Sequence, residues 1–448
     1  MGVSEVRALS SITFTPLSVS RRPVRRRLLA TLAGVLAGVL AIPAAPVAAA
    51  VQPDDDPAVI STWNDIAART LVADTGKLGP IPFFYMGVVH AAMYDAVNGV
   101  HRRYRPYLTK AHAPRGASAQ AAAVAAAHQV LVTYSPAARA TLDTAYAASL
   151  DGLPDGRSKA AGVQYGTRVA DNLIAARVHD GRDAHVEFTQ PPAPGVWRPT
   201  PPALAPMIGP EFALVTPLLL RSGSQFGDPG PPPSLTSAAY TRDFNEVKAL
   251  GSLTSTERTT EQTATALFYS GNAIIQFNAA LRDQVVIRRL DISEAARMFA
   301  AVDMSAADTF ISVWYTKLKY GFWRPDTAIT LADTDGNPAT VADPAWRPMV
   351  PDPAYPEFVS GYSAQAGSFT RSLARSVGTR HLQATLISTA VPGASRGYDS
   401  GSALRADVVN GRMWLGVHFR SADEVGSRMG QRIGDWVLDH YFQPVGRH

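Results

Sequence analysis

The sequence predicts an all-α protein built from two helical bundles that are joined by a proline-rich irregular connector. Three observations predict this fold class. Residues 57–180 are rich in alanine and place apolar residues at helical spacing, and similar patterns return from Ser237 onward. Between them, residues 191–235 contain two proline clusters that exclude a long helix. Alternation typical of strands is scarce along the whole chain.

Residues 1–50 have the pattern of an export signal peptide. A basic segment, residues 1–27, precedes a short apolar run from Leu28 to Leu40, and small residues at 48–50 predict cleavage before Val51. The apolar run is too short to span a membrane. The sequence Ser20-Arg21-Arg22 partly matches a twin-arginine signal, so we expect a secreted or extracytoplasmic protein that uses either the twin-arginine or the general secretory route.

Charge and cysteine content exclude several function classes. The chain has 42 basic and 37 acidic residues, of which residues 1–50 hold six Arg and one Glu, so 36 of each remain after cleavage. A neutral mature chain gives no indication of a nucleic-acid partner. The absence of cysteine from the sequence excludes thiol catalysis and zinc–thiolate sites.

The first half, residues 51–190, is expected to be helical. Apolar spacing predicts helices over 83–100 and 117–133, and Ser135-Pro136 is typical of a helix start, with serine as the cap and proline in the first turn. His90 and His128 lie within apolar patterns. We expect both to be hydrogen-bonded core histidines rather than site residues.

The connector, residues 191–235, contains Trp197, Phe212 and a run of three leucines at 218–220. Free linkers seldom carry such residues, so we expect irregular chain packed on the surface between the two halves. A disordered tether is the alternative.

The second half, residues 236–448, is predicted to resume the helical pattern. Candidate helices cover 238–250, 255–278 and 293–320, turn residues at 334–338 indicate a loop, and a further helix is expected over 364–377.

Three short motifs in this half carry groups that bind anions. The first is Lys317-x6-Arg324-Pro325, in which Lys317 lies near the end of a predicted helix that Pro325 stops. Lysine and arginine at this spacing can converge on one oxyanion. Basic residues that merely offset a helix dipole are the alternative explanation.

The second motif is Val359-Ser360-Gly361-Tyr362, in a tight turn before the helix expected over 364–377. An anion beside that helix N-terminus would meet exposed N–H groups. An ordinary serine cap would explain Ser360 equally well.

The third motif is Gly411-Arg412-x5-His418. A spacing of six does not place Arg412 and His418 on one face of a straight helix, but a break at Gly416 would let both reach one point. Together, the three motifs could surround one tetrahedral oxyanion and present an imidazole nitrogen to its central atom.

These motifs, in this order, resemble the vanadium-dependent haloperoxidase branch of the type 2 phosphatidic acid phosphatase (PAP2) superfamily, whose pattern is K-x6-R-P, P-S-G-H and S-R-x5-H. Trp314 and Phe322-Trp323 also resemble that branch, and so do residues 90–97, 197–202 and 243–248. The resemblance therefore covers nearly the whole mature chain. It implies a mainly helical fold of two bundles.

The resemblance also implies roles for the site residues. Lys317, Arg324 and Arg412 would neutralise the equatorial oxygens of vanadate, and the Ser360 hydroxyl and Gly361 N–H would complete the cradle. His418 would be the axial ligand of the vanadium, and phosphate is the alternative occupant. The substrates would be peroxide, a halide and an organic acceptor, or a phosphate ester.

Tyr362 stands where the family has a second histidine, the acid–base group beside the apical oxygen. A phenol titrates near ~10, against about 6.5 for imidazole, so it is a poor proton shuttle at neutral pH. The expected function is an exported haloperoxidase-like enzyme whose activity Tyr362 impairs or alters. The alternatives are an acid phosphatase with His418 as nucleophile, forming a phosphohistidine, and a non-catalytic or cofactor-free oxyanion-binding homologue. The sequence indicates no oligomeric state.

Overall fold

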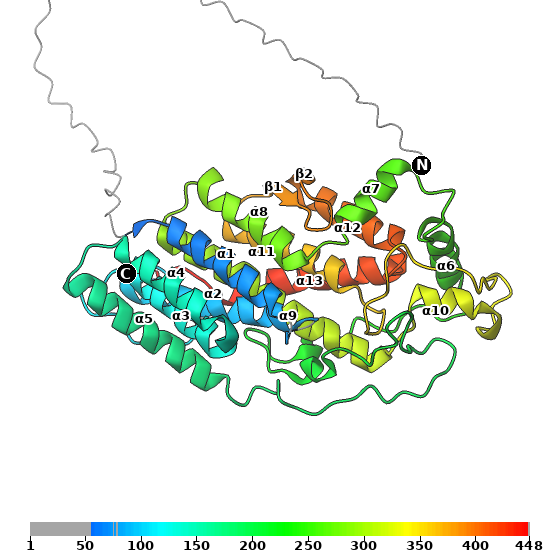
Figure 1. Cartoon of the computed structure of the whole chain (residues 1–448), viewed down its shortest axis with the longest axis horizontal. Coiled ribbons are helices and arrows are strands. Elements are labelled where there is room, and N and C mark those ends of the chain that lie inside the picture. Colours follow the sequence, from blue (N-terminus) through cyan, green and yellow to red (C-terminus); the bar gives the residue numbers. More distant parts are fainter. Residues whose placement is uncertain (1–54, 75, 78, 447–448) are drawn as a thin grey trace, which may run out of the picture. The chain divides into compact units, whose positions relative to one another are not determined.

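The longest helix, α9 (Ile292–Tyr320), connects the two halves of the chain in this computed structural model, which describes residues 55–74, 76–77 and 79–446. It packs against α2 (Ile81–His101) on one side and against α11 (Gly361–Ser376) and α13 (Arg420–His440) on the other (Figure 1). Asp291 and Glu294 form a capping box at its start, and Gly321, in the left-handed conformation at φ +54°, ends it. The helix predicted over 293–320 is thereby confirmed.

Helices α2, α3 and α5 pack on one another in the first half, with α4 and α1 beside them. Their bounds are α1 (Ala58–Ala73), α2 (Ile81–His101), α3 (Ala119–Tyr134), α4 (Arg139–Asp151) and α5 (Arg157–Ala176), with a 3₁₀ turn η2 (Pro136–Ala138) before α4. The helices expected over 83–100 and 117–133 are present. The Ser135 side chain makes no capping bond to η2, so that detail of the prediction was wrong, although Pro136 does occupy the first turn.

His90 and His128 do not line the cavity that holds the site, as expected. His90 is buried; its Nδ1 lies 3.0 Å from the Met86 carbonyl and 3.0 Å from Asp303 Oδ2. His128 is partly buried, and its Nε2 lies 2.7 Å from Asp143 Oδ1. The His90 imidazole therefore links α2 to α9, and the His128 imidazole links α3 to α4.

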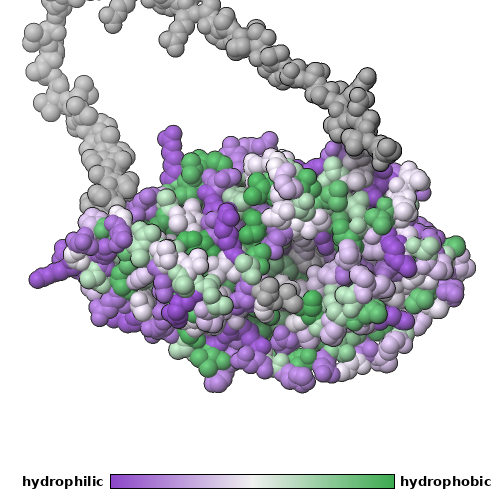
Figure 2. Space-filling model, in the orientation of Figure 1, coloured by the Kyte–Doolittle hydropathy of each residue, from purple (hydrophilic) through white to green (hydrophobic). Residues whose placement is uncertain are grey.

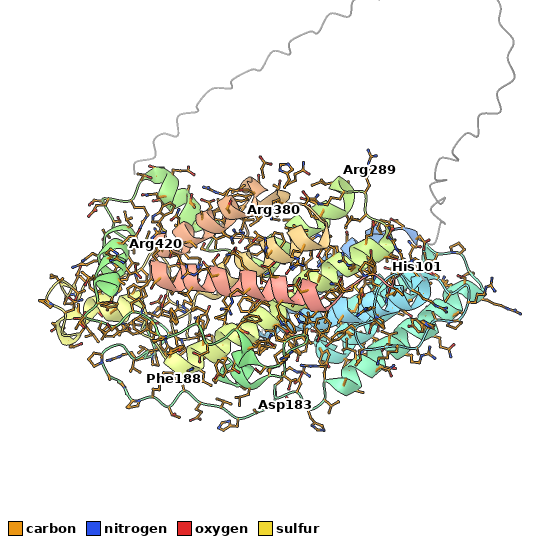
Figure 3. The ribbon with its side chains drawn as sticks, turned by 180° about the vertical axis from the view of Figure 1, so that it is seen from behind. His101, Asp183, Phe188, Arg289, Arg380 and Arg420 are labelled. Atoms are coloured by element: carbon orange, nitrogen blue, oxygen red, sulfur yellow. The ribbon has the colours of Figure 1, made fainter. Side chains whose placement is uncertain are left out.

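The proline-rich stretch is irregular chain held against the second half. Trp197 is buried, and its backbone N–H donates to the Gly321 carbonyl at 2.7 Å. The backbone N–H groups of Leu218, Leu219 and Leu220 all donate to the Asp308 carboxylate at 2.6–2.7 Å. Short 3₁₀ turns η3 (Pro210–Leu214) and η4 (Gly223–Gln225) lie within it, and Figure 3 labels Asp183 and Phe188 on the chain that leads into it. A buried carboxylate with three N–H donors fixes this segment onto α9.

The second half consists of α6 to α13 with one two-stranded hairpin. The bounds are α6 (Ala238–Leu250), α7 (Thr260–Phe268), α8 (Ala273–Ile287), α9 (Ile292–Tyr320), α10 (Pro325–Thr330), η5 (Ala332–Thr334), α11 (Gly361–Ser376), β1 (His381–Ile387), β2 (Ser395–Ser400), α12 (Gly401–Trp414) and α13 (Arg420–His440). The strands are antiparallel, with Ala384 opposite Tyr398 and an irregularity between His381 and Ala384. The chain is mostly helical, as the fold class predicted.

Close packing of α11 on α13 depends on glycine. A Cβ at Gly430 would overlap the Ala364 carbonyl, and one at Gly367 would overlap the Ser427 carbonyl. The two backbones therefore approach closely, which fixes the N-terminus of α11 beside the start of α13.

The prediction of one continuous helix over 255–278 was wrong, because two helices, α7 and α8, occupy this region. The chain is interrupted at 269–272, where Asn272 caps α8 and its N–H donates to the Thr389 hydroxyl at 2.7 Å. This interruption faces a cavity, because residues 270–274 line it.

Residues 51–448 cluster into one unit, and the described ones include no helix that is long and apolar enough to cross a bilayer. Hydrophilic and hydrophobic residues are interspersed over the face in Figure 2. The predicted signal peptide, residues 1–50, lies outside the described residues.

Candidate functional site

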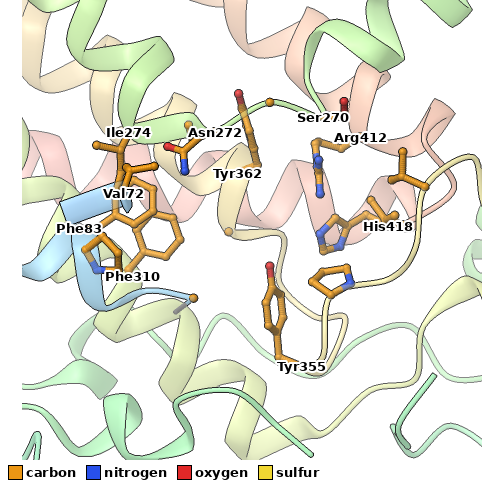
Figure 4. A pocket seen from close by; sticks show the side chains of 18 of the residues that line it. Val72, Phe83, Ser270, Asn272, Ile274, Phe310, Tyr355, Tyr362, Arg412 and His418 are labelled. Carbon is orange, nitrogen blue, oxygen red and sulfur yellow. The ribbon is translucent and has the colours of Figure 1, made fainter. Parts of the chain in front are cut away.

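The three motifs meet at one end of a cavity of about 570 Å³. Gly361, Tyr362, Arg412 and His418 line it directly. Figure 4 shows Arg412 and His418 on one side of the cavity, with Tyr355 and Tyr362 beside them. Lys317 and Arg324 lie behind this lining, and neither side chain is exposed.

Lys317 is fixed in the last turn of α9. Its Nζ donates to the carbonyls of Pro356 and Glu357 at 2.6 and 2.9 Å. The helix ends at Gly321 rather than at Pro325, which instead begins α10 as its first residue. The sequence prediction that Pro325 stops the helix was therefore wrong in detail, because the left-handed glycine ends it first.

Arg324 is the N-cap residue of α10, and its side chain points back toward the third motif. Nε donates to the Tyr355 carbonyl at 3.0 Å and Nη1 to the Val417 carbonyl at 2.6 Å. Nη1 also lies 3.4 Å from His418 Nε2. The Tyr355 ring lies under both cations, 5.0 Å from Lys317 Nζ and 4.9 Å from the Arg324 guanidinium.

Ser360 and Gly361 start α11, three residues earlier than predicted. The Ser360 hydroxyl accepts from the Ser363 N–H at 3.4 Å, so this residue is a helix cap as well as a neighbour of the site. Ser363 Oγ donates to Asp423 Oδ1 at 2.7 Å, which ties this N-terminus to α13.

The break between α12 and α13 brings Arg412 and His418 together. Gly416 has φ +80°, and a Cβ there would overlap the Gly251 carbonyl. Arg412 donates from Nη1 to the Tyr269 carbonyl at 3.0 Å, and its guanidinium lies 5.2 Å from the centre of the Tyr362 ring. The expected break at Gly416 is confirmed.

A buried carboxylate orients His418. Glu357 Oε1 accepts from the Phe419 N–H at 3.0 Å and lies 2.9 Å from His418 Nδ1. Because Arg324, which can only donate, faces Nε2, the proton of the neutral imidazole belongs on Nδ1, where it donates to Glu357. The lone pair on Nε2 therefore points toward the guanidinium groups and the cavity.

The charges of the cluster control the protonation of His418. Burial, followed by the charges of Arg324, Lys317 and Arg412, holds its pKa well below the usual value near 6.5. The imidazole is therefore neutral at pH 7. That is the form required of either an axial ligand or a nucleophile.

Two buried carboxylates, from Glu357 and Asp423, also lie within this charge cluster. Burial raises the pKa of Glu357 to about 8, against the opposing effect of Arg324 and Lys317. Burial also raises the pKa of Asp423 to about 7, although Ser360 and Ser363 donate to it. Both carboxyl groups are thus poised to change charge near neutral pH.

Tyr362 lines the cavity, but its hydroxyl is held elsewhere. The O–H donates to Gln276 Oε1 on α8, and in Figure 4 it points away from the His418 ring. Burial raises the pKa of this phenol above its already high ordinary value. Tyr362 therefore offers no proton exchange at neutral pH.

The residues fit a tetrahedral oxyanion such as vanadate or phosphate. Arg324 Nη2 and Arg412 Nε are buried and have no hydrogen-bond partner within residues 55–446 as described. Two unsatisfied guanidinium N–H groups beside a neutral imidazole nitrogen are costly unless an anion accepts from them. Lys317, with two of its three protons used, can supply one more.

Three participants were not foreseen from the sequence. Glu357 lies two residues before the second motif, and its position three residues before Ser360 is the only signal for it in the sequence. Asp423 follows His418 by five residues, and Gln276 belongs to no motif. Only the folded structure brings Gln276 to Tyr362.

Comparison with known proteins is consistent with this geometry. The family model of the second helical-bundle domain of VCPO matches residues 297–447. Vanadium chloroperoxidase of Curvularia inaequalis is 28% identical over a match that covers 32% of this chain and 29% of that protein. The match spans less than a third of that relative's length.

Solved structures share the fold over most of the chain. The crystal structure of the first bacterial vanadium-dependent iodoperoxidase superposes with a TM-score of 0.74 at 23% identity, covering 88% of this chain and 98% of that one. The holo-type bacterial vanadium-dependent chloroperoxidase gives a TM-score of 0.68 at 18% identity, covering 87% and 98%.

Helical bundles packed around a buried cluster of cationic side chains define the class of this protein, an all-α protein with a domain of the VCPO helical-bundle kind. Over most of its length the chain has the fold of the vanadium-dependent haloperoxidases, and residues 297–447 match the second helical-bundle domain of VCPO, in agreement with the resemblance that the three motifs predicted.

Proposed function

We propose that this protein is an exported haloperoxidase-type enzyme that oxidises halide with peroxide at a vanadate held by Lys317, Arg324, Ser360, Gly361, Arg412 and His418. The observation that carries the proposal is the pair of unsatisfied guanidinium nitrogens, on Arg324 and Arg412, beside the Nε2 lone pair of a neutral His418. Vanadate, when bound, would activate peroxide toward attack by halide.

The chain's own residues would prepare this chemistry. Arg324, Arg412 and Lys317 would neutralise the oxyanion charge, in a buried site where each charged hydrogen bond is stronger than in water. Glu357 holds the His418 ring so that Nε2 faces the site. Tyr362 cannot relay a proton, so peroxide deprotonation would depend on solvent, and we expect a slow enzyme.

The test is bromide or iodide oxidation by peroxide on purified protein, with and without orthovanadate. Orthovanadate should raise the rate, and the Arg324→Ala variant should abolish that increase. A vanadate-independent rate, equal in wild type and variant, would contradict the proposal.

Phosphoryl transfer is the second candidate, because the same neutral Nε2 is positioned as a nucleophile. With no acid beside the leaving group, we expect turnover only of esters with acidic leaving groups. A phosphate-monoester assay on the same sample measures it. If both assays are silent while phosphate raises the melting temperature, the protein is a non-catalytic oxyanion binder.

Export rests on residues 1–50 alone. We expect the protein recovered from the culture medium or periplasm to begin at Val51, and N-terminal sequencing measures this directly.

A further inference from the structure

Tyr355 lies within the oxyanion site but belongs to none of the three motifs. It lines the cavity together with Arg412 and His418. Its ring packs against the ring of Trp314, with the two centroids 4.9 Å apart, and lies under two of the cations. A side chain in this position can contact whatever the cations bind.

The Tyr355 side chain is held in place by its neighbours. The backbone N–H of Tyr355 donates to the Pro353 carbonyl at 2.8 Å, and the Tyr355 carbonyl accepts from Arg324 Nε at 3.0 Å. The ring is confined between Trp314 and the Lys317 and Arg324 cations. A hydrogen-bond donor that is already positioned loses little conformational freedom when it binds a ligand.

The Tyr355 hydroxyl makes no hydrogen bond to the residues that the structure describes, whereas Gln276 holds the hydroxyl of Tyr362. Figure 4 shows the Tyr355 hydroxyl pointing into the cavity, toward the space between Tyr362 and His418. Burial lowers the pKa of Arg412, and Tyr355 opposes this effect more than any other neighbour, as expected of a phenol oxygen near the guanidinium. The hydroxyl is therefore free to bind a ligand and lies beside the cations.

The surrounding side chains favour an anion as the partner of this hydroxyl. Lysine and arginine can only donate hydrogen bonds, so Lys317, Arg324 and Arg412 cannot accept the phenol proton. The oxygen atoms of an oxyanion can accept that proton while they also accept from the guanidinium groups.

We propose that Tyr355 is a further oxyanion-binding residue, whose O–H donates a hydrogen bond to an oxygen of the bound tetrahedral anion. The inference rests on the proposed function in that both require such an anion in this site. Tyr355 would donate from the side of the cavity, where the Tyr362 hydroxyl is turned toward Gln276. Its proton stays on the phenol, so Tyr355 orients the anion and does not replace the missing acid–base group.

Calorimetric titration of the full chain with sulfate tests this hydrogen bond, with Tyr355→Phe as the variant. Phenylalanine keeps the ring that packs on Trp314 and lies under the cations, and it removes only the hydroxyl. We expect the sulfate affinity to fall about tenfold or more, the usual effect of losing one hydrogen bond to a charged group. Equal sulfate affinities of wild type and Tyr355→Phe would overturn the proposal.

Tyr146→Phe is the matched control, because Tyr146 is a partly buried residue of α4 that does not line the cavity. The sulfate affinity of this variant should equal that of wild type. Melting curves show that each variant is folded.

Fluorine NMR of the chain labelled with fluorotyrosine gives a readout that a merely structural role of Tyr355 would not change. Each signal is assigned by its loss in the corresponding phenylalanine variant. Saturating sulfate should shift the Tyr355 signal and leave the Tyr146 signal in place. A Tyr355 signal that does not move would contradict a hydrogen bond to the anion.

The outcomes separate this inference from the proposed function. If iodide oxidation depends on vanadate while Tyr355→Phe binds sulfate as tightly as wild type, this inference alone fails. If Tyr355→Phe loses sulfate affinity while wild type does not oxidise iodide, the proposed function fails and the role of Tyr355 stands. If wild type binds neither sulfate nor orthovanadate, both fail.

Discussion

Glu357 Oε1 lies 2.9 Å from His418 Nδ1, and both side chains are buried. The same oxygen accepts the Phe419 N–H, and the Lys317 ammonium donates to the Glu357 carbonyl. One residue therefore orients the imidazole and is itself fixed by a cation of the oxyanion site. A hydrogen bond to one ring nitrogen of a histidine determines that the other nitrogen is free to act.

Replacing Glu357 tests this positioning role. Glu357→Ala should weaken orthovanadate binding about 10- to 100-fold, the usual effect of removing the orienting partner of a histidine ligand. Sulfate binding should weaken less, because sulfate makes no bond to the imidazole. Vanadium NMR and calorimetry measure the two affinities.

Glu357→Gln serves as the conservative control. Its amide oxygen can accept from both Nδ1–H and the Phe419 N–H, so orthovanadate affinity should stay within about threefold of wild type if hydrogen bonding is the decisive contribution. Equal losses for vanadate and sulfate in Glu357→Ala would instead indicate general damage to the site.

Oxyanion binding should weaken as the pH rises. The pKa is about 7 for Asp423 and about 8 for Glu357, and in each case the protonated, neutral form is favoured by burial. Ionisation of either carboxyl group places a negative charge beside the bound anion. Anion binding is therefore coupled to proton uptake, and the sulfate Kd should rise between pH 6 and pH 9. Burial also lowers the pKa of Lys317, and loss of its positive charge acts in the same direction.

Sulfate is the probe for this measurement because its own charge does not change over the range. In Asp423→Asn the rise in Kd through pH 7 should be smaller, and in Glu357→Gln the rise near pH 8 should be smaller. His418 takes no part here, since its pKa is depressed and it is already neutral. A flat profile in wild type would contradict the assigned ionisations.

The sequence predicted the long helix better than the surrounding ones. Apolar periodicity over 293–320 matched α9 to within one residue, because a buried helix with a capping box and a terminal glycine carries its own boundary signals. The pattern over 255–278 gave no sign of the interruption before α8, since that interruption is held by Thr389, which is distant in sequence. The hairpin went unpredicted although Leu382, Ala384 and Leu386 alternate inward in β1.

The sequence predicted which motifs form the site, but it did not predict the hydrogen bonds and protonation states of their side chains. Ordered spacing indicated that Arg324, Arg412 and His418 converge, and they do. The partner of Tyr362 was not predictable, because Gln276 lies on α8, outside every motif. The protonation of His418 also required the structure, since burial and three cations determine it together.

Tyr362→His should raise vanadate-dependent peroxidase activity at least about tenfold, because a positioned imidazole restores acid–base exchange that is worth about 10²–10⁴ in comparable sites. Peroxide-dependent iodide oxidation measures it. Tyr362→Phe is the control: it removes only the hydroxyl that Gln276 holds, and should leave the rate unchanged while lowering stability by about 1 kcal/mol. A rate in Tyr362→His at or below wild type would show that position 362 has another role.

Arg412→Lys separates a positive charge from the geometry that delivers it. Lysine keeps the charge but loses both the bond from Nη1 to the Tyr269 carbonyl and the planar fork, whose buried Nε has no partner among the described residues. Sulfate affinity should fall about tenfold, since one charged hydrogen bond contributes about 1.5–3 kcal/mol.

Arg428→Lys is the matched control, because the Arg428 side chain is 62% exposed. Its nearest carboxylate contact is long, at 3.6 Å from Nη1 to Glu424 Oε2. Its sulfate affinity should equal that of wild type. Calorimetric titration with sulfate decides the comparison. If Arg412→Lys bound as tightly as wild type, charge alone would hold the anion, and the hydrogen-bond geometry of the cluster would not matter for binding.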